Sequence, residues 1–216
     1  MAQGVTVGVV LASLDWAFER AVKGAAGVDS ARVLADDYLT GEGDLVDKVR
    51  RLIRHQAVLA AAAGFVSGFG GMASMPVMVP VNLASVMFVQ MRMIAAIALM
   101  GGHDLKEEHV KLVVLACLAG DAAKDVLKDV LKDVGIVIGT RMAVSALRNV
   151  SGKTLSAVNR AVGRRLFGAA GRKGPLRVVP LMGGLVGGTL DALATRVIGR
   201  VALAAFVGGA EGGTLR

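Results

Sequence analysis

The chain has 216 residues, of which 54% are hydrophobic, 19% charged and only 4% aromatic. This composition excludes an intrinsically disordered protein, which needs low hydrophobicity and high charge. The single cysteine, Cys117, excludes an internal disulfide and a cysteine-based zinc site. Because aromatic residues are scarce, small aliphatic side chains must fill the core, and this favours closely packed helices over a sheet.

The net charge of +8 is unevenly distributed along the chain. Residues 134–216 contain twelve basic and two acidic residues, so this part carries +10 and the remainder −2. Nine lysines and arginines lie between Arg141 and Arg177 without any Asp or Glu. A stretch of one sign indicates an anionic partner, such as phospholipid headgroups, nucleic acid or another phosphate.

Apolar residues three and four apart predict a first helix that ends near residue 23, where Gly24 follows. Ser30 offers an N-cap for a second helix that ends near Gly41. A third helix is expected from near Asp44. It carries several charges at first and is apolar from Ala57 onward.

The middle of the chain, residues 55–91, contains no Asp, Glu, Lys or Arg. Glycines, Pro76 and Pro80 interrupt this run, and we expect a new helix from Pro80 to Met100. Two interpretations of residues 57–91 stay open. They form either the helices of a soluble core or a helical hairpin that dips into a membrane.

The second half of the sequence predicts further helices. A long amphipathic helix is expected over 105–133, and others over about 136–149 and 154–170, with a last helix from Pro180 to about Val207. Strictly alternating strand patterns are absent from the sequence. We therefore predict an all-α fold, a single compact domain of about seven or eight helices.

Glycines four residues apart, at 64/68, 183/187 and 184/188, predict tightly packed glycine-rich helix contacts. The expected organisation is an amphipathic N-terminal helix over 1–27, a helical domain over 28–207 and a flexible tail over 208–216. The N-terminus has an apolar run without preceding basic residues, so no secretory signal is expected.

The basic region between Arg141 and Arg177 contains a predicted amphipathic helix, with apolar residues on one face and arginines elsewhere. Basic amphipathic helices are typical of proteins that bind anionic membrane surfaces. The alternative is an ordinary solvated helix face. The predicted lipid- or anion-binding residues are Arg148, Lys153, Arg160, Arg164, Arg165, Arg172, Lys173 and Arg177.

Polar residues interrupt the apolar helices. We expect Arg92 to be buried and within salt-bridge distance of Asp121, Asp125 or Asp191, because an isolated buried charge is costly. Together, the polar residues on these helices form either a core network that fixes helix packing or a polar pocket for a headgroup or substrate. Its predicted members are Asn82, Gln90, Arg92, Asp121, Lys124, Asp125, Asp191 and Thr195.

The motifs of catalysis and metal binding are incomplete. Gly152-Lys153-Thr154 ends like a phosphate-binding loop, but the first glycine of that motif and its preceding strand are missing. His103 and His109 are six residues apart, and metal-binding helices place histidines four apart. We therefore assign no catalytic residue, metal or cofactor, and expect Cys117 to be a buried, inert thiol.

Three blocks of sequence together resemble the EcsC protein family of bacteria. They begin GFVSGFGGMASMPVMVPVN at residue 64, CLAGDAAKDVLKDV at residue 117 and VPLMGGLVGGTLDALATRV at residue 179. The resemblance implies an all-helical, membrane-associated protein without an established catalytic activity. The family takes its name from a locus that encodes an ABC transporter. Its pattern includes residues matching Asn82, Gln90, Arg92, Lys124, Asp125, Asp191 and Thr195, but not His103 or His109.

The leading hypothesis is a non-enzymatic, cytoplasmic protein, peripheral at the inner face of the cell membrane, that binds anionic phospholipid through residues 141–177. An ABC transporter or another membrane protein is a further expected partner. Two alternatives remain. One is a hydrolase or lipid-modifying enzyme that uses the Arg/Asp polar set, and the other is a soluble scaffold. Nucleic acid is disfavoured, because aromatic side chains for base stacking are scarce.

Overall fold

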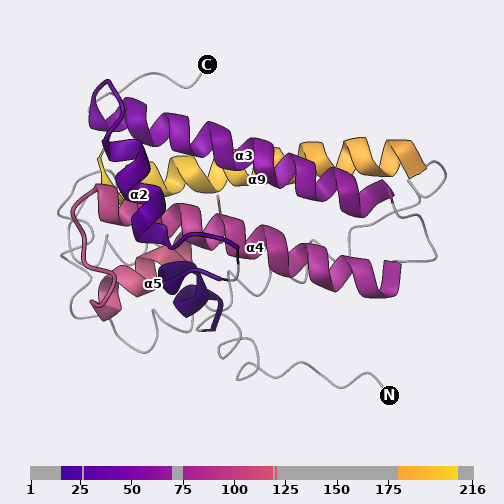
Figure 1. Cartoon of the computed structure of the whole chain (residues 1–216), viewed down its shortest axis with the longest axis horizontal. Coiled ribbons are helices and arrows are strands. Elements are labelled where there is room, and N and C mark those ends of the chain that lie inside the picture. Colours follow the sequence, from indigo (N-terminus) through magenta and orange to yellow (C-terminus); the bar gives the residue numbers. More distant parts are fainter. Residues whose placement is uncertain (1–15, 26, 70–74, 119, 121–179, 209–216) are drawn as a thin grey trace, which may run out of the picture.

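The computed structural model describes residues 16–25, 27–69, 75–118, 120 and 180–208 (Figure 1). Three long helices, α3 (Leu45–Phe69), α4 (Met75–Met100) and α9 (Pro180–Phe206), lie side by side along the longest axis. Two shorter helices, α2 (Ala31–Leu39) and α5 (Glu108–Cys117), pack at one end, and residues 16–23 are also helical. Within these residues the β structure is limited to one isolated bridge. The all-α prediction is confirmed.

The first three helices have the boundaries that their local sequence predicts. Gly24 follows the first helical segment and has a φ of 90°, a left-handed conformation that glycine adopts readily. The side chain of Ser30 accepts a hydrogen bond from the Val33 amide at 3.2 Å and caps α2. The carboxylate of Asp44 accepts one from the Asp47 amide at 2.8 Å and caps α3.

The fourth helix begins earlier than expected. We predicted a start at Pro80, but α4 begins at Met75 and contains both Pro76 and Pro80. The amides in the first turn of a helix have no partner within the helix, so Pro76 removes no hydrogen bond there. Pro80 removes one, and the helix continues through it to Met100.

The single helix predicted over 105–133 is wrong in the described part. A turn occupies 105–107, and α5 then runs only from Glu108 to Cys117. Gly120 has a φ of 62°, and its amide donates to the Cys117 carbonyl at 3.0 Å. A glycine in the left-handed conformation commonly ends a helix, whereas the apolar spacing on both sides of it had suggested continuity.

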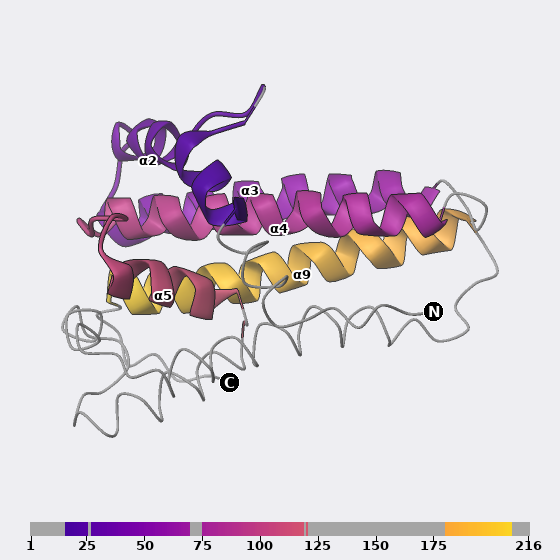
Figure 2. The ribbon, with the colours of Figure 1, turned by 90° about the horizontal axis from the view of Figure 1, so that it is seen from below.

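The hydrophobic core lies where all five labelled helices meet. Figure 2 shows α2 on one side of α3 and α4, with α5 and α9 on the other. All residues from Gln90 to Ala98 on α4 are buried, because neighbouring helices surround this part of α4. A helix that is apolar on all sides is expected in such a position.

Two glycines of α9 permit the close approach of α3. A Cβ atom at Gly188 would lie 2.6 Å from the Ala61 carbonyl oxygen, and one at Gly199 would lie 2.7 Å from the Ile53 side chain. Since Gly188 faces Ala61 and Gly199 faces Ile53, the two helices are antiparallel. The predicted helices over about 136–149 and 154–170 lie outside the described residues, as do residues 1–15 of the predicted first helix and 121–133 of the helix predicted over 105–133.

Candidate functional site

The three long helices form an end of the bundle without charged residues, here named the uncharged end. It consists of residues 55–69 of α3, 75–91 of α4 and 180–190 of α9, which contain no Asp, Glu, Lys or Arg. In Figure 1 these segments lie on the right, opposite α2 and α5. The remaining parts of the five helices form the charged end.

Exposed large apolar side chains are most frequent on α3 and α9. Of the nine large hydrophobic side chains that are exposed in the described part of the chain, five lie on α3 or α9. Val58 and Leu190 have the largest exposed fractions of these, 59% and 60%. The five are Val58, Leu59, Phe65, Leu190 and Leu193.

Four arginines line a groove of about 550 Å³ between α3 and α9, here named the arginine groove. The other lining residues are apolar, and no acidic residue is among them. Arg50 and Arg54 are one turn apart on α3, as are Arg196 and Arg200 on α9. The complete lining is Arg50, Ile53, Arg54, Leu193, Arg196, Arg200, Leu203 and Ala204.

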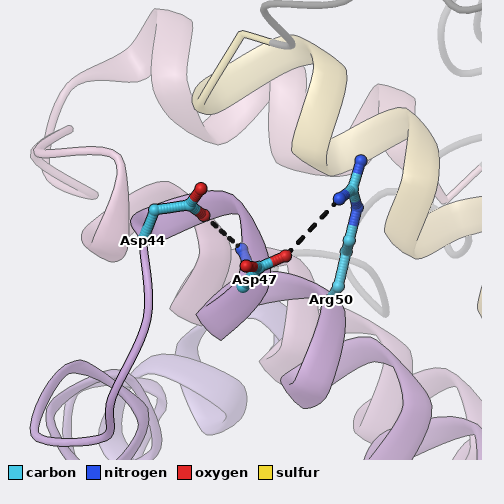
Figure 3. Close-up of polar contacts among 3 residues, drawn as sticks. All are labelled: Asp44, Asp47 and Arg50. Carbon is cyan, nitrogen blue, oxygen red and sulfur yellow. Dashed lines mark hydrogen bonds and ion pairs between the residues drawn. The ribbon is translucent and has the colours of Figure 1, made fainter.

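One of the four arginines has an acidic neighbour. The Asp47 carboxylate lies 3.5 Å from Nη1 of Arg50 while the Asp47 amide donates to Asp44 (Figure 3). Figure 3 also shows the Arg50 side chain extending toward α9. Among the described residues, Arg54, Arg196 and Arg200 form no ion pair. The groove therefore carries an excess of positive charge.

A second pocket, of about 570 Å³, lies beside α2 and contains a tyrosine–histidine pair. The Tyr38 hydroxyl and Nδ1 of His55 are 2.6 Å apart. Burial and the neighbouring Asp37 raise the pKa of Tyr38, and Arg51 and Arg92 oppose this rise. The remaining lining residues are Asp37, Arg51, Arg54 and Val58, so Arg54 lines both pockets.

The predicted polar set is only partly described. Gln90 and Thr195 are buried, and Nε2 of Gln90 donates to the Thr195 hydroxyl at 3.1 Å, which joins α4 to α9. Asp191 is partly buried one turn before Thr195. Asn82 is on α4, but its side chain is not described, and Asp121, Lys124 and Asp125 lie outside the described residues.

Arg92 is buried, with 8% of its surface exposed. Its Nη1 donates to the main-chain oxygen of Asp29 at 3.0 Å, and it forms no ion pair with a described carboxylate. Pairing with Asp191 is therefore not observed. Burial lowers the pKa of Arg92, while the charge of Asp29 and the Tyr38 hydroxyl act in the opposite direction. Arg92 thus holds the chain that enters α2 against α4.

The histidines outside the pocket have other partners. Nε2 of His103 lies 3.0 Å from the Phe206 carbonyl, and Nε2 of His109 lies 2.9 Å from Glu107. Within the described ranges no three His, Cys, Asp or Glu residues gather in a way that could hold a metal ion. Cys117 is fully buried as expected, and burial raises its pKa to about 12, which disfavours the reactive thiolate.

The arginine groove was not predicted from the sequence. Its signal was present, since Arg50/Arg54 and Arg196/Arg200 are both pairs four residues apart. Only the packing of α3 on α9 brings the two pairs together, and no local pattern predicts that packing. The predicted lipid-binding residues, from Arg148 to Arg177, lie outside the described residues and remain a prediction.

The fold and this site define an all-helical protein with a charge-free end and a basic groove at the border of that end. The sequence model of the EcsC protein family matches residues 43–207, and the chain belongs to this family. The match covers α3, α4, α5 and α9 and begins after α2. No curated protein and no solved structure matches the chain.

None of the helices in the described ranges has both the length and the apolar character needed to cross a bilayer.

Proposed function

We propose that this protein is a non-enzymatic, peripheral membrane protein that binds anionic phospholipid surfaces. The observation that carries the proposal is the uncharged end of the bundle, with exposed Val58 and Leu190 and with arginines at its border. Apolar side chains that enter a bilayer contribute burial energy, and arginines at headgroup level attract anionic lipid.

The length of the uncharged end supports entry into one leaflet. At about 1.5 Å per residue, residues 55–69 of α3 extend about 20 Å. Half of a bilayer, including its headgroups, is about 20–22 Å thick. Arg54, directly before the uncharged segment of α3, and Arg196, one to two turns after that of α9, would then lie near the headgroups. The carboxylate of Asp191, which directly follows the uncharged segment of α9, would lie at the same border. The basic residues between Arg141 and Arg177 are proposed to add electrostatic attraction to the same surface.

The two alternatives receive less support. Neither of the two pockets is lined by Arg92 or Asp191, the residues on which the enzyme alternative depends. A soluble scaffold needs no charge-free end with exposed leucines. An ABC transporter, which would lie in the membrane that this protein is proposed to bind, remains a proposed partner.

Flotation with vesicles of phosphatidylglycerol and phosphatidylcholine tests this proposal. We expect Leu190→Asp and Val58→Asp each to weaken binding by about tenfold or more, because a charge placed in the hydrocarbon region costs up to about 3 kcal/mol. The matched control is Val33→Asp, which adds the same charge at a side chain that is 43% exposed on α2. Carbonate washing of the bound protein then separates insertion from surface attraction.

The control variant should float as the parent protein does. The proposal is wrong if the parent fails to float with anionic vesicles. It is also wrong if Leu190→Asp and Val33→Asp float equally well. Binding of the parent to neutral vesicles alone would contradict the requirement for anionic lipid.

A further inference from the structure

We propose that the arginine groove is a discrete site for one lipid phosphate, with the phosphate held by arginines and the adjoining acyl chain on the apolar residues beside them. This inference rests on the proposed function and deepens it. It names the lipid group that the protein recognises, a phosphomonoester headgroup, and the residues that recognise it. These residues differ from the basic region predicted between Arg141 and Arg177.

The groove follows from the way α9 packs on α3. Gly199 lies against the Ile53 side chain, so the two helix axes are close at this level. Residues 196 and 200 flank Gly199 on α9, and residues 50 and 54 flank Ile53 on α3. Close antiparallel packing at a glycine therefore sets two arginine pairs across one groove.

The charge in the groove favours an anion with more than one negative charge. Four arginines line the groove, and among the described residues one carboxylate, that of Asp47, forms an ion pair with them, 3.5 Å from Arg50. Arginine binds phosphate oxygens through paired N–H groups, which suits a tetrahedral phosphate held between two helices. A phosphomonoester carries about 1.5 to 2 negative charges at neutral pH, more than the single charge of a phosphodiester.

The apolar lining distinguishes a lipid from free phosphate. Ile53, Leu193, Leu203 and Ala204 line the groove with the arginines, and half of the Leu193 surface is exposed. Leu190 lies one turn from Leu193 in the direction of the uncharged end and is 60% exposed. A free phosphate ion would leave this apolar surface exposed to water, whereas the acyl chain of a lipid whose phosphate is bound by the arginines would cover it.

The groove also lies at the right level for a headgroup. Arg54 immediately precedes the charge-free part of α3, and Arg196 follows the charge-free part of α9 by one to two turns. If the uncharged end enters a leaflet, the four guanidinium groups lie at the depth of the lipid phosphates. An acidic protein segment would match the charge but would leave the apolar continuation uncovered.

Calorimetric titration of the full chain tests the inference with soluble probes. The probes are dihexanoyl phosphatidic acid below its critical micelle concentration, inorganic phosphate, dihexanoyl phosphatidylcholine and a polyglutamate peptide. We expect saturable binding of phosphatidic acid, inorganic phosphate weaker by about tenfold or more, and no detectable binding of the other two. Thermal melts of each variant monitor folding.

Two variants separate the parts of the site. Arg196→Gln combined with Arg200→Gln should weaken phosphatidic acid binding by about tenfold or more, because two of the four guanidinium groups are removed. Leu193→Ser should weaken phosphatidic acid but leave inorganic phosphate unchanged. The matched control, Arg32→Gln combined with Lys106→Gln, removes two exposed charges outside the groove and should bind as the parent does.

The outcomes distinguish this inference from the proposed function. Equal binding of phosphatidic acid by the parent and the Arg196/Arg200 variant overturns the groove site, while flotation that depends on Leu190 would still support membrane binding. Equal affinity for inorganic phosphate and phosphatidic acid overturns the lipid assignment. Binding of polyglutamate without phosphatidic acid points to an acidic protein partner instead and also overturns the inference.

Discussion

The two ends of the bundle share three helices, α3, α4 and α9, but differ in what covers these helices and in which side chains are exposed. At the charged end, α2 and α5 cover α4, and polar contacts tie the elements together. An example is the bond from Arg92 to the Asp29 carbonyl. At the uncharged end, the described residues comprise α3, α4 and α9 alone, and large apolar side chains such as Leu190 are exposed.

Under the proposed function, apolar residues have two roles in this chain. The apolar residues from Met91 to Ala98 are buried by four neighbouring helices and stabilise the fold. The exposed apolar residues on α3 and α9 contribute less to folding, and the proposed membrane contact would give them a different role. Three predictions test whether the two ends differ in this way.

The largest expected effect compares the same substitution at each end. Ile94→Asp should destabilise the protein by more than about 4 kcal/mol or prevent folding, because Ile94 is fully buried and the new carboxylate would have no partner. Leu190→Asp should change stability by less than about 1 kcal/mol, since its side chain is 60% exposed. Urea denaturation measures both. Equal destabilisation by the two variants would contradict the comparison.

A smaller effect is expected at the border between the two ends, where Gln90 bonds to Thr195. Thr195→Val should cost about 1–3 kcal/mol, because it leaves the buried amide of Gln90 without its acceptor. Combining it with Gln90→Met should cost less than the sum of the single changes. Urea denaturation of the four proteins gives the coupling energy. Additive costs would show that the bond is not important for joining α4 to α9.

The smallest effect concerns Cys117 at the charged end, whose pKa burial raises from 9.0 to about 12. The unfolded thiol ionises near pH 9 and the folded thiol does not, so stability is complete below pH 9 and falls as the pH rises toward 12. Between pH 8 and pH 10 the parent should lose roughly 1.4 kcal/mol more than Cys117→Ala. Parallel pH profiles would show that the thiol is accessible to water.

Local signals predicted most of the helix boundaries. Ser30 caps α2, Asp44 caps α3 and Pro180 begins α9, because each residue acts on backbone groups within one turn of itself. The helix boundaries that were predicted wrongly also rested on local signals. α5 ends at Cys117, shortly before Gly120, against an apolar pattern that had suggested a longer helix, and Pro80 was overvalued as a helix start.

The candidate site was less predictable than the helices. The buried state of Arg92 followed from its apolar neighbours, but its contact with the Asp29 carbonyl joins residues 63 positions apart. The charge-free run over 55–91 was visible in the sequence, but its extension by residues 180–190 of α9 was not. The arginine groove was missed because its two halves lie on helices that are distant in the chain.

By itself, the sequence determined the helical class, most helix ends, the family resemblance and the location of the charge-free run, since composition and contacts within one turn are written in consecutive residues. Only the tertiary structure decided which helix faces meet. Gly188 and Gly199 let α9 approach α3 closely, and that approach places Arg196 and Arg200 across from Arg50 and Arg54. The physical reason is that side chains from two helices form a site only when packing fixes their register, and packing depends on the shapes of both surfaces at once.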